Sequence, residues 1–259
     1  MNEGSPVLPL WPGEVSGAAA TSLRFRVEDW AACRVLVPNQ VEWSGAAIRA
    51  AGSAAPPALP VLLRRRVSAI GQRAFEAASR LSASAEARFV FCSRHGEYRR
   101  TQGLLEALAA AEPVSPADFS LSVHHALAGL LSIARRAGAG HTSVAAGSDS
   151  FGYGLLEAAT CLAAGDEQEI LLVYFDEPLP ADYPALSEGE DAFVAAFLLR
   201  PARGGAGDIA LFAGPPDETV PRRSATEQAR DFVGFLGSEA AERHSRGGRV
   251  QWRWRRESA

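Results

Sequence analysis

The sequence predicts an α/β fold, with parallel strands in one sheet and helices packed on its faces. Apolar runs of strand length alternate with helical segments through the middle of the chain. The predicted strands span residues 87–93, 142–146 and 169–175, and the predicted helices span 98–111, 124–137 and 151–164. Alternation of this kind produces parallel neighbouring strands joined by helical crossovers.

The N-terminal part is predicted to be mostly irregular. Residues 1–21 are rich in Pro, Gly, Ser and Ala without any period, so we expect them to be disordered and residues 22–259 to form a single domain. The elements predicted up to residue 60 are a strand at 22–27, an irregular stretch from Asp29, a helix from Pro38 to Arg49 and a Pro/Ala linker at 50–60.

A helix is predicted over residues 63–81, because apolar residues recur there at helical spacing. The shared face carries Val67, Ile70, Ala74, Ala77, Ala78 and Leu81. The cluster Arg64–Arg66 near its start is either a solvated helix end or a docking surface for an acidic partner.

The central helices have recognisable ends. Pro113 follows the helix at 98–111, and Gly138 and Gly140 follow the helix at 124–137. Gly165 is the natural residue to end the helix at 151–164, since helices commonly stop at a glycine in the left-handed conformation.

The C-terminal third changes pattern. Strands at 192–199 and 208–213 flank a Gly-rich turn, so we expect them to pair antiparallel. Ser224 and Glu227 form a capping-box pattern at the start of a helix that we extend to Glu242. The final alternating run places Val250, Trp252 and Trp254 on one face and mostly arginines on the other, which predicts an edge strand.

Composition excludes several functions. The formal net charge is −4, which argues against a nucleic-acid partner, because such a partner selects a strongly basic face. Every basic residue is arginine, so lysine-based Schiff-base and PLP chemistry is excluded.

The remaining titratable residues predict neither a metal nor a cofactor. Cys33, Cys92 and Cys161 lack the spacing of metal ligands, and their odd number suits a reducing compartment. The first residues lack the features of a signal peptide, and no run approaches the roughly 20 apolar residues of a membrane span. We therefore expect a cytoplasmic protein without a membrane span.

Ser148 is the first candidate for chemistry. It lies between a predicted strand and a helix N-terminus, where peptide N–H groups and the helix dipole favour a developing anion. The surrounding Gly147–Gly152 does not match the G-x-S-x-G pattern on either serine. The competing interpretation is that Ser148 or Ser150 only caps the helix.

His124 and His125 are the candidate bases. Adjacent helical residues point about 100° apart, so at most one of them faces a given site. The alternative is a histidine at a helix N-terminus that only bonds to the backbone.

Several segments in order resemble the β-ketoacyl synthase family, whose fold is thiolase-like. They are LRRRVSAIGQRAFEAASRL, the strand and helix that follow it, VSPADFSLSVHHALAG, and HTSVAAGSDSFGYGLLEAATCLAAG. The resemblance covers roughly residues 22–215. It implies a layered α/β/α fold with a mixed sheet, made of one repeat plus a reduced second half.

Two departures from the family bear on function. The resemblance places Ser148 where the family has its acylated cysteine, and neither catalytic histidine motif, E-x-H-G-T-G or N-S-F-G-x-G-G-x-N, occurs. Serine needs a general base where a thiolate does not. Condensation by this chain alone is therefore not expected.

The resemblance implies a non-catalytic subunit of the chain-length-factor type, as in aryl polyene clusters. Its partner would be an active ketosynthase, in a heterodimer or heterotetramer, with an acyl carrier protein as a further candidate partner. The unit from Phe119 to Ala146 is the expected pairing surface. The alternatives are a serine-dependent acyl transferase or thioesterase using Ser148, and a decarboxylase of carrier-bound malonyl groups.

Overall fold

The computed structural model describes residues 22–36, 40–45, 59–180, 182–183 and 191–258. The predicted disorder at 1–21 and most of the predicted linker at 50–60 lie outside these residues. The assignment of 22–259 to one domain therefore stays a prediction.

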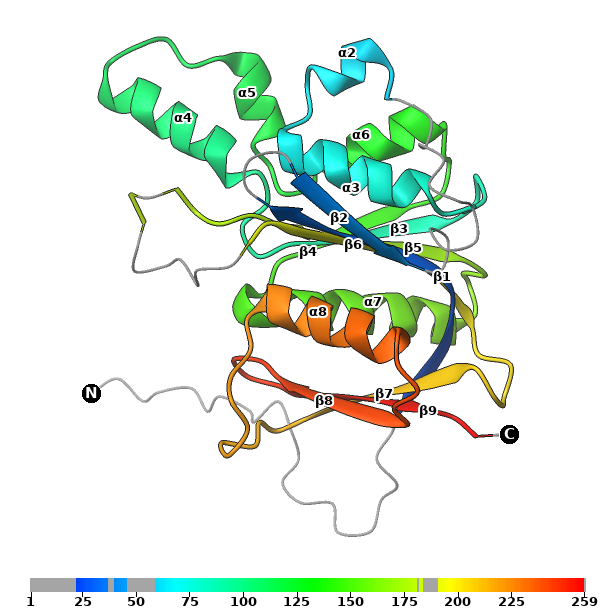
Figure 1. Cartoon of the computed structure of the whole chain (residues 1–259). Coiled ribbons are helices and arrows are strands. Elements are labelled where there is room, and N and C mark those ends of the chain that lie inside the picture. The colour runs from blue at the N-terminus through cyan, green and yellow to red at the C-terminus, as the bar shows by residue number, and fades with distance from the viewer. Residues whose placement is uncertain (1–21, 37–39, 46–58, 181, 184–190, 259) are drawn as a thin grey trace, which may run out of the picture.

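The described residues form nine strands, seven α-helices and one 3₁₀ turn (Figure 1). The strands are β1 (Leu23–Leu36), β2 (Gln40–Gly45), β3 (Arg88–Cys92), β4 (His141–Val144), β5 (Ile170–Asp176), β6 (Phe193–Pro201), β7 (Asp208–Gly214), β8 (Glu242–Arg246) and β9 (Gln251–Arg256). The helices are α2 (Val61–Arg64), α3 (Ala69–Ser79), α4 (Tyr98–Ala109), α5 (Pro116–Leu121), α6 (Ala126–Arg135), the 3₁₀ turn η1 (Gly147–Asp149), α7 (Ser150–Ala164) and α8 (Ala225–Leu236).

The strands form one hydrogen-bonded mixed sheet that is bent into two parts by β1. The order is β4-β3-β5-β6-β1-β7-β9-β8, with β2 also paired to β1. β1 pairs with β6 along most of its length and with β7 only at residues 23–26. In Figure 1, α2–α6 lie on one side of the upper part, with α3 and α6 packed on its face, while α7 and α8 lie between the two parts.

The predicted parallel core is confirmed. β3 runs parallel to both β4 and β5, and each crossover is helical. β4 lies at the end of the sheet, so its second edge has no neighbour among the described strands. Gly165 ends α7 in the left-handed conformation at φ 88°, as predicted.

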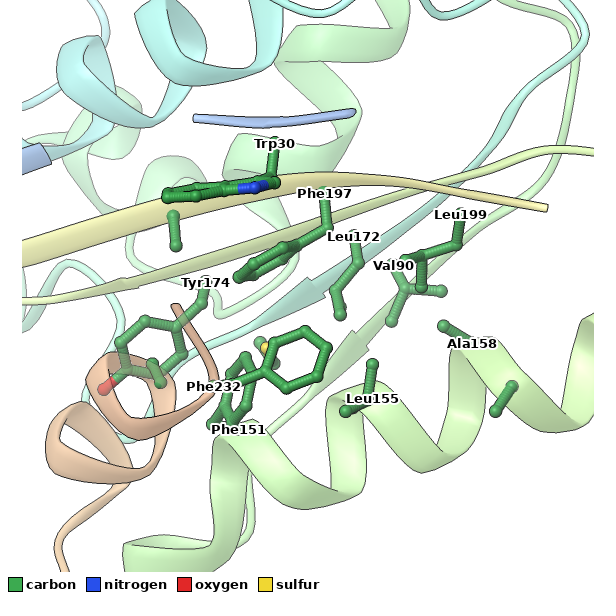
Figure 2. Packing of buried hydrophobic residues seen from close by; sticks show 14 of the residues in the cluster. Trp30, Val90, Phe151, Leu155, Ala158, Leu172, Tyr174, Phe197, Leu199 and Phe232 are labelled. Atoms are coloured by element: carbon green, nitrogen blue, oxygen red, sulfur yellow. The ribbon is translucent and has the colours of Figure 1, made fainter. Parts of the chain in front are cut away.

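Two apolar clusters hold the layers together, one on each face of the upper part of the sheet. The inner cluster lies between this part and α7 and α8, and the outer cluster lies under α3 and α6. β5 is buried throughout and contributes alternate residues to each. Ile170, Leu172 and Tyr174 face α7 and α8, and Leu171, Val173 and Phe175 face α3 and α6. Figure 2 shows Phe151 and Leu155 of α7 and Phe232 of α8 packed against this sheet.

The N-terminal predictions are partly wrong. The strand predicted at 22–27 continues through the expected irregular stretch to Leu36, with a bulge between Val27 and Asp29. Residues 40–45 of the predicted helix form β2, in which Val41 and Trp43 alternate onto the outer cluster. Residues 38–39 and 46–49 of that helix lie outside the described residues.

The helix predicted over 63–81 is divided in two. Ser68 starts α3, and its hydroxyl accepts a hydrogen bond from the Gly71 N–H at 3.2 Å. The Ser68 N–H in turn donates to the Glu97 carboxylate at 2.9 Å. A serine cap thus interrupts an apolar pattern that is continuous in sequence.

The helix predicted over 124–137 begins at Ala126, so that His125 is its N-cap residue and His124 precedes it. It ends at Arg136 in the left-handed conformation, before the predicted glycines. Residues after Ser115 form α5, a short helix that the sequence analysis did not include, with Pro116 in its first turn.

The C-terminal pairing was also predicted wrongly. β6 and β7 do not pair with each other, because β1 lies between them and is antiparallel to both. The capping box at Ser224 is confirmed, but α8 ends at Leu236. Glu242 begins β8, which takes the edge position predicted for β9.

Candidate functional site

The turn before α7 is shaped by Gly147 and Ser150. Gly147 adopts φ 62°, which favours glycine. The Ser150 hydroxyl donates to the Gly147 carbonyl at 2.7 Å and accepts from the Ala146 N–H at 2.9 Å. Ser150 therefore secures the turn, and Ser148 is left for other contacts.

Ser148 is only 6% exposed and is enclosed by residues from the region of α8. Arg222 donates from Nη2 to the Ser148 hydroxyl oxygen at 2.5 Å. The side-chain amide of Gln228, fully buried in α8, donates to the Ser148 carbonyl oxygen. An arginine donor at this hydroxyl cannot accept its proton, so this contact supplies no general base.

Asp149 is buried beside Ser148 and faces the turn between β8 and β9. Its carboxylate accepts from the Arg249 N–H at 2.9 Å and from the Trp252 indole N–H at 3.4 Å. The Arg249 guanidinium lies 3.9 Å from the same carboxylate. Asp149 therefore links the turn to the C-terminal hairpin.

Close backbone approaches show how tightly these segments fit. A Cβ atom on Gly247 would lie 1.6 Å from the Asp149 carboxylate, and one on Gly152 would lie 2.1 Å from the Trp252 ring. Tyr153 meets the same indole edge-on, with ring centroids 5.3 Å apart. Glycine is required where the hairpin and α7 touch.

Neither candidate histidine bonds to Ser148 within the described part of the chain. The His125 Nδ1 lies 3.0 Å from the Ser143 hydroxyl, and the His125 ring packs against His141 at 4.4 Å. Burial lowers the pKa of His124, with Asp176 and the backbone acting in the opposite direction. The hypothesis that one of these histidines acts as a base for Ser148 is therefore not supported by a hydrogen bond between them.

A buried polar group that the sequence analysis missed lies at the ends of β3 and β5. Asp176 is 5% exposed, and burial raises its pKa against the hydrogen bonds that it accepts. The donors are the Ser93 hydroxyl (2.9 Å), the Arg94 N–H (2.7 Å), the His95 N–H (3.1 Å) and the Tyr174 hydroxyl (2.8 Å). A carboxylate directly after an apolar strand was the available signal.

The open edge of β4 lies next to the turn that carries Ser148. The carbonyls of Gly140 and Val144 accept from the β3 side, from Phe89 at 3.1 Å and Ser93 at 3.2 Å. Because backbone groups alternate along a strand, those of His141 and Ser143 point to the open edge. They are available to another strand.

A pocket of about 340 Å³ lies beside this edge. Val144 and Ala146 line it from the end of β4, and Arg249 lines it from the hairpin turn. The remaining lining residues share one face of α7 and are Tyr153, Leu156, Glu157 and Thr160. The end of β4, α7 and the C-terminal hairpin thus line one pocket together.

The sequence of the chain matches a known protein family. The sequence model described as "Beta-ketoacyl synthase, N-terminal domain" matches residues 40–255. The chain belongs to this family. The match extends well beyond residue 215, so β8 and nearly all of β9 are part of the β-ketoacyl synthase N-terminal domain as well.

Solved ketosynthase structures show the same thiolase-like fold. A chain of the complex of the ketosynthase ApeO with its chain length factor ApeC from Xenorhabdus doucetiae is similar at 26% identity, with a TM-score of 0.73. That match covers 90% of this chain and 100% of the other. No curated protein sequence matches the chain significantly.

More distant structures share the fold alone. The ishigamide ketosynthase/chain length factor matches at 15% identity and a TM-score of 0.54, over 75% of this chain and 68% of that one. A β-ketoacyl synthase from Burkholderia phymatum STM815 matches at 14% and 0.53, over 74% and 64%.

The described residues were also searched for metal-binding groups, disulfides and membrane-spanning helices. They contain no group of three or more His, Cys, Asp or Glu side chains able to hold a metal ion. All three cysteines, which lie within the described residues, are free thiols. None of the helices described has both the length and the apolar character for crossing a bilayer.

Proposed function

We propose that this chain is a non-catalytic subunit of the chain-length-factor type. It pairs with an active β-ketoacyl-ACP synthase in the biosynthesis of a polyene or another fatty-acid-type polyketide. The similar ApeO complex contains such a pair, a ketosynthase with its chain length factor. Assignment to aryl polyene biosynthesis and to the cytoplasm belongs to the same proposal.

One juxtaposition carries the proposal: an open sheet edge beside an arginine-bound serine. β4 ends the sheet, with the backbone groups of His141 and Ser143 pointing outward. An unpaired edge strand is a ready template for a second chain. A partner strand there would continue the sheet next to the turn that carries Ser148.

The surroundings of Ser148 support assigning the condensation to the partner. A serine hydroxyl becomes a nucleophile only when a base takes its proton. Here the hydroxyl accepts a hydrogen bond from Arg222, which stays protonated in proteins. The chain therefore contributes a surface to the reaction and the partner contributes the thiolate.

The pocket beside β4 would face the partner in such a pair. Its walls include apolar side chains from α7 and the end of β4. These residues are placed to border a tunnel for the growing acyl chain and to limit its length. Leu156 and Tyr153 are the bulky residues on that wall.

An acyl carrier protein is a second proposed partner. Arg64, Arg65 and Arg66 are exposed and make no ion pair with another described residue. Arg100, in contrast, pairs with Asp118 at 2.5 Å and donates to the Arg66 carbonyl at 3.0 Å. The three arginines are thus free to meet an acidic surface.

Co-expression with a β-ketoacyl-ACP synthase from the same genome tests the pairing. Light scattering after size-exclusion chromatography should give the mass of a heterodimer or heterotetramer. The presence of this chain should also change product length in a reconstituted condensation assay. A stable monomer that alters neither the solubility nor the products of the ketosynthase would contradict the proposal.

The acyl transferase or thioesterase alternative makes a different prediction. Incubation with acyl thioesters would leave an adduct on Ser148, detectable by mass spectrometry. The pairing proposal expects no adduct and expects Ser148→Ala to pair and to set product length normally.

A further inference from the structure

The turn that carries Ser148 is enclosed by segments that come from the C-terminal third of the chain. Arg222 and Gln228 bond to Ser148, while Arg249 and Trp252 bond to Asp149. Both residues of the turn are nearly inaccessible, with exposures of 6% for Ser148 and 1% for Asp149.

The enclosing segments are fastened to one another. The Arg223 N–H donates to the Arg246 carbonyl at 2.7 Å, and Arg222 forms a parallel bridge with Arg246. A Cβ atom on Gly248 would lie 3.2 Å from Arg222 Nη2. The guanidinium over Ser148 is therefore held between the turn and the hairpin.

Asp149 connects this cover to α7. It is a buried carboxylate whose hydrogen bonds go to the hairpin backbone and to the Trp252 indole. The absence of a side chain at Gly247 lets the hairpin approach the carboxylate closely. A bond between a carboxylate and an N–H is roughly twice as strong as a neutral one, so this contact dominates the junction.

We propose that Asp149 is a positioning residue that holds the β8–β9 turn and Arg222 over Ser148. The acyl site is thereby closed by the chain itself and stays closed whatever residue occupies position 148. This inference rests on the proposed function, for which it explains why the reactive thiolate must come from the partner.

Two features could each make this site inactive: the serine at position 148 and the closed cover over it. If serine alone silenced the site, a cysteine at position 148 would restore a reactive thiol. Arg222 and the N-terminus of α7 would favour its thiolate form. A closed cover would nevertheless keep the thiolate from any electrophile until the hairpin opened locally.

Alkylation of a cysteine introduced at position 148 tests the closure. Cys161 is replaced by serine to remove the one native thiol that is not buried, since Cys33 and Cys92 are buried. Ser148→Cys and, as the open control, Ser120→Cys on the exposed side of α5 are treated with iodoacetamide across a pH series and followed by intact mass. The pH series separates thiolate fraction from access, because access sets the limiting rate at high pH.

We expect the limiting rate at position 148 to be at least about tenfold below that of the control, since charge-assisted hydrogen bonds must break first. Adding Asp149→Asn, or Trp252→Phe, which removes the indole donor together with part of the buried ring, should raise the rate toward the control. Circular dichroism checks that each variant is folded.

The closure would be wrong if Ser148→Cys reacted as fast as the control with Asp149 intact. It would also be wrong if neither Asp149→Asn nor Trp252→Phe changed the rate in a folded protein. Co-purification with the ketosynthase is measured on the same variants. An open site with normal pairing would refute only the closure, whereas a closed site without pairing would refute only the proposed function.

Discussion

At the residue scale, Trp252 is the side chain that joins the C-terminal hairpin to the rest of the protein. It is fully buried, lies against Gly152, and meets Tyr153 edge-on. Burying so large an aromatic side chain contributes several kcal/mol, and its loss leaves a cavity.

Gly152→Ala should therefore destabilise the protein. The new methyl group would lie 2.1 Å from the Trp252 ring, which has to shift. Overpacking of this kind costs about 1–3 kcal/mol. Urea unfolding followed by circular dichroism measures this loss of stability.

Gly129→Ala in α6 is the matched control, because a methyl group there meets nothing within 4 Å and should be neutral or stabilising. Equal effects at both glycines would contradict the packing.

Asp208 gives a pH-dependent prediction. Burial acts to raise its pKa, but hydrogen bonds from Gly204, Gly205, Arg26 and Arg203 outweigh burial, so the pKa lies below its usual value. A lowered pKa in the folded state means stability that is present above the unfolded pKa, about 3.9, and is lost as pH falls through the folded pKa.

Asp208→Asn should accordingly lower the free energy of unfolding by about 2–3 kcal/mol near neutral pH. The difference from the wild type should begin to shrink below pH about 3.9, where the carboxyl of the unfolded chain becomes protonated, and should vanish as the pH falls through the lower pKa of the folded state. Urea titrations at several pH values measure this. A difference that stays constant with pH would show that the charge of Asp208 does not stabilise the Gly-rich connection.

Residues were predicted where a local pattern determined them. The alternation of Trp252 and Trp254 with arginines indicated their common buried face, and both are fully buried. The contact of Arg222 with Ser148 joins residues far apart in sequence, so no local pattern could reveal it. The histidines were chosen as an adjacent pair on a predicted helix, and only the structure shows that His125 bonds to Ser143.

At the element scale, β4 is the strand on which the proposed pairing depends. Ser143 offers its N–H to the open edge, while Gly140 and Val144 serve the ladder with β3. The Ser143 side chain has a separate contact with His125. The backbone and side-chain roles of Ser143 can thus be tested one at a time.

Ser143→Pro should abolish co-purification with the ketosynthase, because proline removes the outward N–H without removing a bond to β3. Ser143→Ala keeps that N–H and loses only the hydroxyl, so it should pair normally. Pull-down with a tagged ketosynthase measures both. Normal pairing by a folded Ser143→Pro variant would place the interface elsewhere.

Elements with a local signal were predicted, and elements set by distant pairing were not. β3 and β5 are apolar runs bounded by polar residues, and α7 lies between Gly147 and Gly165; all three were found. β8 is short and polar, and its sequence ERHSR carries no strand signal. It forms because β9 lies beside it.

At the scale of the whole molecule, the bent sheet encloses α7 and α8 between its two parts. The strands β7, β9 and β8 close over α7 and α8, so that Trp252 and Trp254 complete the inner cluster (Figure 1). On the outer face Arg253 and Arg255 lie over Phe212, at 3.9 and 5.0 Å from its ring centroid. A charged cover of this kind suits a sheet face in contact with water.

The same architecture leaves the open edge of β4 at the opposite end of the sheet from β8. The charged side chains of β8 discourage further pairing at that edge. β4 carries only His141, Thr142, Ser143 and Val144, with no charged carboxylate or arginine. Of these two ends of the sheet, β4 is therefore the one better suited to the proposed pairing.

Amide hydrogen exchange on β4 tests pairing most directly. The N–H groups of His141 and Ser143 point to the open edge and should exchange quickly in the isolated chain. In the complex with the ketosynthase, we predict strong protection of these two amides, with those of Thr142 and Val144 little changed. Unchanged exchange at His141 and Ser143 in a stable complex would contradict pairing through this edge.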